Sequence, residues 1–254
     1  MIYLTIQARM GSTRLPGKVL KHLWKNYSVL TYMIKRLSFV DGDKKIVILT
    51  TKNKKDLPIV KLCKKLKIDY FRGSEHDVLK RMYDFIIKFD VHESNDVIVD
   101  LTGDCPLVDP YLINDMIFKY LFYGYQYLSN IITRSYPDGF DIQLYSSLLI
   151  KKLNNIIHNK NHRDHTGWNI LNYSHLLYKY IGTIKIGNIP APENQFYPGI
   201  GMTVDTKEDL TMLQTLLSYF DTPFPSSFEL INKAIAMDLI KINKTIERKI
   251  PGVR

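Results

Sequence analysis

A loop rich in glycine and positive charge directly follows the first predicted strand. The segment from Gln7 to Lys18 reads QARMGSTRLPGK and carries three cationic side chains within ten residues, Arg9, Arg14 and Lys18. Gly11 and Gly17 allow the backbone to approach a ligand closely, and backbone amides at the start of a helix attract anions. A strand, such a loop and a following helix together predict a polyphosphate-binding site.

The spacing of this loop excludes the Walker A motif of P-loop nucleotidases. That motif has four residues between its glycines and a serine or threonine after its lysine. Here five residues separate Gly11 from Gly17, and Val19 follows Lys18. The alternative to a phosphate site is an ordinary strand-to-helix connection with surface cations, because short motifs give false positives.

Two aspartates stand where predicted strands end. Asp104 follows a strand at 96–101, and Asp205 ends a strand at 201–204, just before a helix capped by Thr206. Ligands of open α/β sheets collect at the carboxyl edge of the strands, and Mg²⁺ prefers one or two carboxylates with phosphate oxygens and water. The two aspartates are therefore candidate magnesium ligands, with helix capping or loop stabilisation as the alternative.

Strands and helices alternate through the first half of the chain, which predicts a mainly parallel sheet with crossover helices. Strands are predicted at 2–6, 45–50, 69–71 and 96–101. Helices are predicted at 29–39, around the apolar positions 59 to 66, from an N-cap at Ser74 through Phe89, and from Asp109-Pro110 onward.

The regular alternation weakens after about residue 125. We predict a strand at 126–130, a turn-rich stretch at 135–141, helices at 146–158 and 163–173, a strand at 180–187 and a loop at 190–201. We expect a single catalytic domain over residues 1–254. Within it, about residues 130–200 are expected to form an arm for dimerisation or acceptor binding.

Composition limits the class of protein. A chain of 254 residues with 45% apolar content can bury one large α/β core. No apolar run reaches the roughly 18 to 20 residues of a membrane span, and the chain enters a strand at once, so we expect a cytoplasmic protein with no membrane partner. Cys63 and Cys105 lack disulfide or zinc spacing and are expected to be reduced thiols.

The formal net charge of +10 raises the question of a nucleic-acid partner. Much of the excess surrounds one predicted helix, whose inward apolar face leaves Lys61, Lys64 and Lys65 in solvent. No aromatic-studded nucleic-acid module accompanies these lysines, so no such partner is expected. A basic chain also suits a site that holds a highly charged anion.

The order of residues in the first loop closely resembles the signature of the cytidylyltransferases related to the spore-coat polysaccharide protein of bacilli. That group is similar in turn to the synthetases that make CMP-activated 3-deoxy-manno-octulosonate and sialic acid. Further stretches resemble the family in the family's order, through about residue 210: VILTT (47–51), RGS (72–74) with Asp77, Val78, Leu79 and Arg81, TGDCPL (102–107), YPDG (136–139) with Asp141, and TVDT (203–206) with Glu208 and Asp209. The resemblance implies a three-layer α/β nucleotidyltransferase fold of the nucleotide-diphospho-sugar transferase type, with a mostly parallel central sheet and a protruding arm.

The resemblance also implies a reaction, in which CMP passes from CTP to an acceptor and pyrophosphate is released. The acceptor would be an acidic sugar, a phosphorylated sugar or polyol, or a phosphonate, used in surface polysaccharide or related glycan biosynthesis. Mg²⁺ is the implied cofactor, and CTP, the small acidic acceptor and a second copy of the chain are the implied partners. Catalysis of this type is chiefly positioning and electrostatics, so no covalent nucleophile is required.

Site residues follow from the resemblance position by position. Arg14 and Lys18 would be catalytic, and Asp104 and Asp205 would bind the metal. The implied nucleotide-binding residues are Gln7, Ala8, Arg9, Met10, Gly11, Ser12, Arg14, Lys18, Arg72, Gly73, Ser74, Arg81, Gly103 and Asp104. The implied acceptor-binding residues are Asn130, Arg134, Asp138, Asp141 and His165.

Some of these residues have a simpler interpretation. Ser74 is also a favoured helix cap, and Asp138 and Asp141 lie in a stretch that forms a turn whatever its function. The segment 162–166 resembles a stretch that the family keeps near this turn. A metal site of histidines is not favoured there, and His158 and His162 are expected on a helix surface.

One position departs from the family, whose members usually carry Arg four residues before the metal-binding aspartate. This chain has Asp100 there, and a reversed charge near the triphosphate alters the local field. It could signal a different acceptor or a second metal contact. Two other functions stay open: a nucleotide-sugar-dependent glycosyltransferase, although Gly103-Asp104-Cys105 replaces the usual Asp-x-Asp, and a catalytically silent nucleotide-binding subunit.

Overall fold

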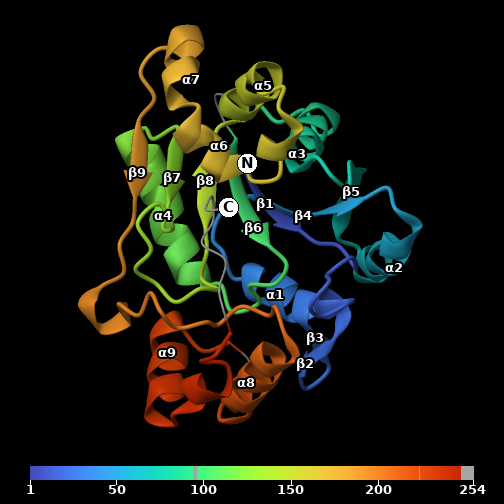
Figure 1. Cartoon of the computed structure of the whole chain (residues 1–254), viewed down its shortest axis with the longest axis vertical. Helices are drawn as coiled ribbons and strands as arrows, with labels where there is room; N and C mark the ends of the chain where they lie inside the picture. The colour runs from blue at the N-terminus through green and yellow to red at the C-terminus, as the bar shows by residue number, and fades with distance from the viewer. Residues whose placement is uncertain (94–95, 223, 247–254) are drawn as a thin grey trace.

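A seven-stranded sheet forms the centre of the computed structural model, which describes residues 1–93, 96–222 and 224–246 (Figure 1). The strand order is β5-β4-β1-β6-β8-β7-β9. Within the described residues, β8 alone runs against its neighbours, so the sheet is mostly parallel as predicted. The strands are β1 (Ile2–Gln7), β4 (Lys44–Thr51), β5 (Asp69–Gly73), β6 (Val97–Thr102), β7 (Tyr127–Ser129), β8 (Gln143–Tyr145) and β9 (Ile186–Asn188).

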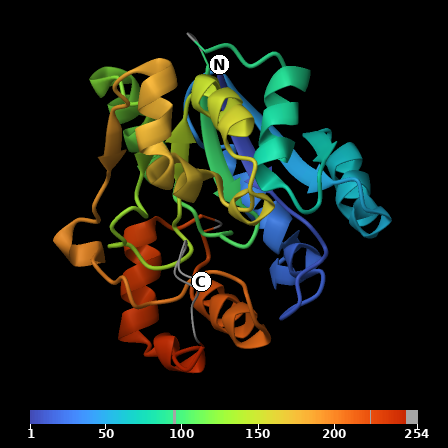
Figure 2. The same cartoon turned by 45° about the horizontal axis from the view of Figure 1, so that its top comes forward.

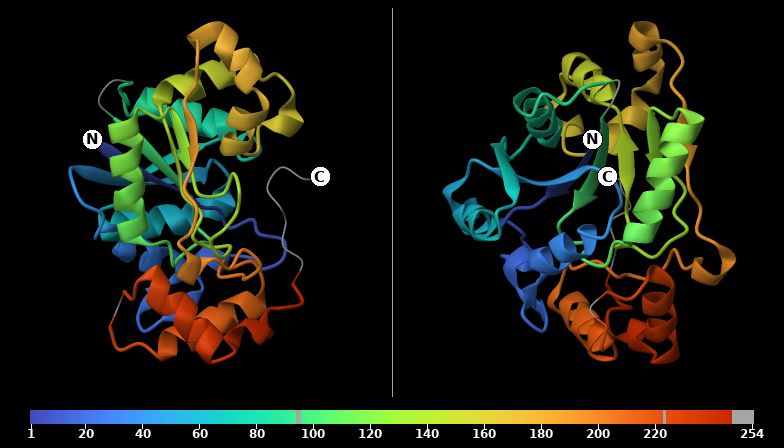
Figure 3. Two further views of the ribbon diagram at one scale, coloured as in Figure 1. Left: turned by 90° about the vertical axis from the view of Figure 1, so that its left-hand side faces the viewer. Right: turned by 180° about the vertical axis from the view of Figure 1, so that it is seen from behind.

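Helices cover both faces of this sheet and make the predicted three layers (Figure 3). One face packs on α1 (Val29–Leu37), α2 (Leu57–Leu66) and α4 (Pro110–Tyr123), and the apolar core on this side continues to α8 (Lys207–Ser218) and α9 (Ser227–Ala236) beyond the end of the sheet (Figure 1). The other face packs on α3 (Val78–Lys88), α5 (Ser147–Ile156), α6 (Thr166–Asn172) and α7 (Ser174–Ile181). Side chains alternate between the two faces of a strand, so successive residues of β4 pack against opposite helix layers. Ile48 packs in the core on the side of α1, whereas Val47 and Leu49 pack in the core on the side of α3.

Helix starts follow the expected capping chemistry with one correction. Asp109 caps α4, whose first residue is Pro110, and Thr206 forms a reciprocal capping box with Asp209 at α8. The prediction that Ser74 caps α3 is wrong, because Asp77 accepts the bond from the Lys80 amide and α3 begins at Val78. Ser74 Oγ instead accepts from the Asp77 amide at 3.2 Å.

The predicted strand at 180–187 is wrong in its first half. Helix α7 continues to Ile181, and β9 begins only at Ile186 and ends at Asn188. The predicted helix at 163–173 begins instead at Thr166. The predicted strand at 201–204 is also wrong, since Gly201 makes a single bridge to Asp138.

Residues 130–200 belong largely to the sheet and one of its layers. They contribute β8, β9 and the helices α5 to α7, which lie over one face of the sheet in Figure 2, while α8 and α9 lie at the far end of the molecule. Short elements that were not predicted complete the chain. They are the strands β2 (His22–Trp24) and β3 (Tyr27–Ser28) and the 3₁₀ helices η1 (Lys18–Leu20), η2 (Lys54–Asp56), η3 (Lys160–His162), η4 (Glu193–Gln195) and η5 (Leu239–Ile242).

The predictions for the lysines of α2 and for the two cysteines are confirmed. Lys61, Lys64 and Lys65 are exposed on α2, as the apolar periodicity of that helix requires. Both cysteines are buried free thiols, and burial raises the pKa of Cys63 to about 11. None of the helices in the described ranges is long and apolar enough to cross a membrane.

Candidate active site

The loop after β1 is closed on itself by backbone hydrogen bonds. The carbonyl of Met10 accepts from the amides of Ser12 and Gly17, both at 3.0 Å, and Gly17 adopts a left-handed φ of 67°. The amide of Met10 donates to the buried carboxylate of Asp56 at 2.7 Å. Because only glycine adopts such a φ freely, Gly17 is required for the turn that ends the loop.

The helix expected after this loop does not begin directly at its end. Lys18 opens the three-residue η1, a hairpin of β2 and β3 follows, and α1 begins only at Val29. So short a helix aligns few peptide dipoles. Attraction for an anion therefore comes from the cationic side chains of the loop and its open backbone, with little help from a helix dipole.

Lys18 bridges the two candidate metal ligands. Its ammonium lies 2.6 Å from Asp104 Oδ2 and 2.8 Å from Asp205 Oδ1, and Arg14 contacts the other oxygen of Asp205 at 2.8 Å. Burial lowers the pKa of Lys18, but the two carboxylates outweigh that effect and leave it raised. Burial raises the pKa of Asp104, yet Lys18 brings it below its ordinary value, so both groups of this pair are charged near neutral pH.

Two chain segments from distant parts of the sequence bring these aspartates together. The carbonyl of Asp104 accepts from the amide of Val204 at 2.8 Å and from the Thr203 hydroxyl at 3.1 Å. The amide of Asp205 donates to Asp209, the buried residue of the α8 capping box. Asp205 is therefore positioned by a helix start, and capping explains Asp209 and Thr206 rather than Asp205 itself.

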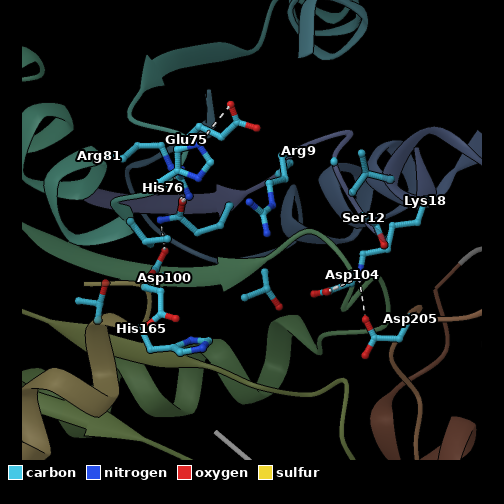
Figure 4. Close-up of a pocket in the computed structure, with 18 of the residues that line it drawn as sticks. Arg9, Ser12, Lys18, Glu75, His76, Arg81, Asp100, Asp104, His165 and Asp205 are labelled. Carbon is cyan, nitrogen blue, oxygen red and sulfur yellow. Dashed lines mark hydrogen bonds and ion pairs between the residues drawn. The ribbon is translucent and has the colours of Figure 1, made fainter. Parts of the chain in front are cut away.

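A cleft of about 510 Å³ opens at the carboxyl ends of β1 and β6 (Figure 4). Ten of the predicted site residues line it: Gln7, Ala8, Arg9, Gly11, Ser12, Arg14, Lys18, Arg81, Asp104 and Asp205, together with His165 from the predicted acceptor set. Residues that were not predicted also line it: Thr13, Val19, Glu75, His76, Val78, Thr102 and Gln143. Asp164 and Thr166, from the segment 162–166 that was expected near the turn at 135–141, line it too. Asp100, singled out as a departure from the family, lines it as well.

The segment before α6 reaches the cleft because Arg163 ties it to α3. The guanidinium of Arg163 pairs with Asp77 at 2.7 Å, and its carbonyl accepts from the amide of Leu79. This contact places Asp164, His165 and Thr166 beside the start of α3. Nothing in the sequence spacing linked these two segments, which are more than eighty residues apart.

A chain of hydrogen bonds runs along the inner part of the cleft. Arg81 donates through two nitrogens to Gln7 Oε1, at 3.0 and 2.9 Å, and Gln7 Nε2 donates to Asp100 Oδ1 at 3.2 Å. Thr5 donates to the same oxygen at 2.9 Å. The pKa of Asp100 is raised, because the effect of its burial exceeds the opposing effects of its hydrogen bonds and of Arg81.

Arg72, Gly73 and Ser74 lie behind the cleft. Arg72 donates to the carbonyls of Thr51 and Asn53, and the Ser74 carbonyl accepts from Arg81 at 2.6 Å. A Cβ on Gly73 would lie 2.5 Å from Cγ of Arg81. Gly73 and Ser74 therefore position Arg81, whereas Arg72 binds the backbone after β4. Met10 anchors the loop against the core, and Gly103 donates its amide to the Gln7 carbonyl.

Gly73→Ala should destabilise the protein by about 1 to 3 kcal/mol, because the added methyl group collides with a buried arginine that cannot move freely. It should also weaken nucleotide binding by displacing Arg81. Thermal unfolding and calorimetry measure the two effects. Gly199→Ala is the matched control, since nothing lies within 4 Å of its added Cβ. Equal behaviour of both variants would contradict the steric role of Gly73.

The remaining candidate acceptor residues do not line the cleft. Asn130 is buried, and its side chain bonds to the backbone of Phe140 and Ile142. Arg134 forms a two-point pair with Asp141, at 2.8 and 2.7 Å, and lies 3.6 Å from Asp138. This cluster lies near Cys105, where burial, Asp104 and then these carboxylates raise the thiol pKa.

The donor set at the edge of the sheet suits a hard divalent cation. Asp104 and Asp205 already share one cationic group, the Lys18 ammonium, and each keeps part of its surface open to the cleft. Within the described ranges no cluster of three or more His, Cys, Asp or Glu side chains offers a fuller metal cage. Two carboxylates completed by phosphate oxygens and water are the ligands that Mg²⁺ prefers.

A mostly parallel α/β sheet with a cationic loop and paired carboxylates at its carboxyl edge defines a nucleotide-binding enzyme fold. The sequence model of the cytidylyltransferase family matches residues 4–137. The spore coat polysaccharide biosynthesis protein SpsF of Bacillus subtilis is 32% identical over 237 residues, 91% of this chain and 92% of that protein. An uncharacterized protein of Methanocaldococcus jannaschii is 33% identical over 216 residues, 85% of this chain and 83% of that protein.

Solved structures agree with these sequence relatives. A cytidylyltransferase from Leptospira borgpetersenii superposes with a TM-score of 0.85 at 30% identity, covering 97% of this chain and 99% of that one. CMP:2-keto-3-deoxy-manno-octonic acid synthetase, solved with CTP, shares the fold with a TM-score of 0.61 at 15% identity, over 86% of this chain and 98% of that one. The chain belongs to the cytidylyltransferase family and is a CTP-dependent nucleotidyltransferase.

Proposed function

We propose that the cleft binds CTP with its triphosphate on the loop from Gly11 to Lys18 and transfers CMP to an acceptor oxygen. The observation that carries this proposal is the cluster of Arg14 and Lys18 with Asp104 and Asp205 at the carboxyl edge of the sheet. It combines two cations that can bind phosphate with two carboxylates that can hold a metal. Both belong to the same cleft.

In the proposed reaction an acceptor oxygen attacks the α-phosphorus in line. A new P–O bond forms to the acceptor, the bond to the β-phosphate breaks, and pyrophosphate and a proton leave. Arg14 and Lys18 hold the triphosphate and offset the charge that builds on the leaving group. Mg²⁺ bound by Asp104 and Asp205 would add positive charge at the same oxygens.

We propose an acidic sugar, a phosphorylated sugar or polyol, or a phosphonate as the acceptor. Two relatives support a glycan setting: one is named for spore coat polysaccharide biosynthesis, and one is a synthetase named for an acidic sugar. Glycan biosynthesis, and surface polysaccharide in particular, is therefore the process we propose for this enzyme.

The direct assay measures pyrophosphate from CTP and Mg²⁺ with a panel of acidic sugars, phosphorylated polyols and phosphonates. We expect release with at least one acceptor, and CTP binding by calorimetry without any. No release across a broad panel together with no CTP binding would refute the proposal. Tight CTP binding without turnover, even with the true acceptor, would favour a catalytically silent subunit, and consumption of a nucleotide-sugar would favour a glycosyltransferase.

We also propose that the enzyme is a homodimer, and that the second copy packs on the outer face of α4. Tyr111, Phe118 and Phe122 fall on one side of this helix, are 61 to 76% exposed, and include a stacked pair with ring centroids 5.4 Å apart. Apolar patches of this kind mark interfaces. Asp115 and Lys119, 2.6 Å apart beside the patch, would meet their opposite charges if two α4 helices packed antiparallel about a two-fold axis.

Phe122→Asp should convert the dimer to a monomer, because it buries a charge in the proposed contact. Sedimentation equilibrium measures the mass of both proteins. Tyr180→Asp, a similar change on α7 within the segment first predicted to dimerise, is the matched control and should leave the dimer intact. A monomeric wild-type protein, or dissociation by Tyr180→Asp alone, would contradict the assignment to α4.

A further inference from the structure

The cleft has two chemically distinct ends. Lys18, Asp104 and Asp205 lie at one end in Figure 4, and Arg81 and Asp100 lie at the other. Under the proposed function the first end holds the triphosphate and the metal. The nucleobase then extends along the cleft, and the residues at the second end are the ones that can read its edge.

The floor of this second end consists of polar side chains from three adjacent strands. Gln7 ends β1, Asp100 lies in β6 and Gln143 begins β8, and the register places Asp100 directly opposite Gln143. All three line the cleft. A sheet floor is rigid, so a hydrogen-bonding group on it has a fixed position, which recognition of a flat base requires.

The direction of the hydrogen bonds on this floor is determined by Arg81. A guanidinium can only donate, so the Gln7 atom that meets Arg81 is the carbonyl oxygen. The Gln7 amide NH₂ therefore faces Asp100 and donates to Oδ1. Thr5 donates to the same oxygen. Every bond in the series runs toward Asp100, which makes its carboxylate the acceptor at the end of the chain.

Both charged groups keep capacity for a ligand. A carboxylate offers about four lone-pair positions, and Thr5 and Gln7 occupy two of those of Asp100, with the Tyr145 hydroxyl close by. Arg81 has five N–H groups, and its hydrogen bonds to Gln7 and Ser74 use three of them. An acceptor from Asp100 therefore lies beside donors from Arg81.

This pairing matches cytosine and opposes uracil. Cytosine presents its 4-amino donor next to the acceptors N3 and O2, whereas uracil presents the O4 acceptor next to an N3–H donor. A carboxylate accepts from the cytosine amino group but repels the O4 of uracil. We propose that Asp100, oriented by Gln7 and Arg81, selects CTP over UTP by accepting a hydrogen bond from the 4-amino group of cytosine.

The proposal rests on the proposed function, because it needs CTP in this cleft, and it adds the residue that determines the base. It also gives Asp100 a role of its own. The carboxylate that departs from the family pattern lies away from Lys18 in the cleft and within a network of neutral and cationic donors, where it serves recognition instead of metal binding.

Calorimetry with wild-type protein, Mg²⁺ and no acceptor provides the test. We expect CTP to bind at least about tenfold more tightly than UTP, and than a CTP analogue with hydrogen in place of the 4-amino group, as one good base contact predicts. In Asp100→Asn, whose amide can turn an N–H toward the base, the preference for CTP over UTP should fall at least about tenfold. Asp84→Asn, the same change on the outer surface of α3, is the control and should keep the preference.

The possible results distinguish a failure of the role proposed for Asp100 from a failure of the proposed cytidylyltransferase function. Failure of wild-type protein to bind CTP refutes the proposed function. CTP binding with an unchanged CTP/UTP ratio in Asp100→Asn overturns the role of Asp100, and a change confined to the acceptor KM would assign Asp100 to the acceptor side. If Asp100→Asn does not fold, equal binding of CTP and the analogue lacking the amino group by wild-type protein overturns the proposal without any variant.

Discussion

Replacing Lys18 with alanine should lower kcat/KM for CTP at least about a hundredfold, a loss of about 2.7 kcal/mol in transition-state stabilisation. The Lys18 side chain is 12% exposed and forms ion pairs with both Asp104 and Asp205. No other side chain in the described ranges bridges these two carboxylates. Its loss removes a charge from the triphosphate site and also leaves two carboxylates facing each other. Steady-state release of pyrophosphate measures the effect.

Lys21→Ala is the matched control for this experiment. Lys21 follows the same short helix η1 but is exposed to solvent, so its removal should leave turnover within about twofold. Thermal unfolding of Lys18→Ala separates lost chemistry from lost folding. Near-normal turnover of a folded Lys18→Ala protein would contradict the catalytic role of Lys18.

Asp104→Asn should also lower kcat at least about a hundredfold, and it should raise the Mg²⁺ concentration needed for half-maximal activity. The substitution keeps the size of the side chain but removes the negative charge that Lys18 stabilises. It also leaves Lys18 paired with Asp205 alone of the two carboxylates. Titration of activity with Mg²⁺ at saturating CTP measures both effects.

Asp43→Asn tests whether the loss is specific to the site. Asp43 is an exposed carboxylate before β4, and its amide variant should titrate with Mg²⁺ as wild-type protein does. If Asp104→Asn lowers kcat but leaves the Mg²⁺ titration unchanged, Asp104 acts only through Lys18. If neither quantity changes, the site described here is not the catalytic one.

The central elements of the fold were predictable because their signals are local. The strands β1, β4 and β6 are short apolar runs between turn residues, and the structure places each within one or two residues of its predicted range. Asp109 and Thr206 cap helices as their sequence context indicates. The apolar periodicity of the sequence likewise predicted the helices α2 and α3.

The errors arose where tertiary contacts override local preference. Residues 201–204 are apolar enough for a strand, yet Val204 instead bonds to the carbonyl of Asp104 and helps to form the site. The helix capped by Asp77 starts three residues later than a Ser74 cap predicted, because Asp77 also binds Arg163 from a distant segment. Neither the contact of Val204 with Asp104 nor that of Asp77 with Arg163 can be predicted from residue spacing.

The candidate site divides in the same way. The loop residues 7–18 form one continuous motif and Asp104 directly follows a predicted strand, so the sequence indicated most of the cationic end of the cleft. The inner end depends on β8 and on the segment before α6, which reach the cleft only through sheet register and the Arg163 contact. Gln143 was therefore not predictable from motifs, and no spacing in the sequence placed Asp164 and Thr166 in this cleft.

A crystal structure with CTP and Mn²⁺ would test directly whether this cleft binds the nucleotide and its metal, since the anomalous signal of Mn²⁺ marks the metal position. We expect the triphosphate along the loop from Gly11 to Lys18, the metal bonded to Asp104 and Asp205, and the cytosine at Asp100. A triphosphate bound outside this cleft, or a metal bound by neither aspartate, would contradict this expectation.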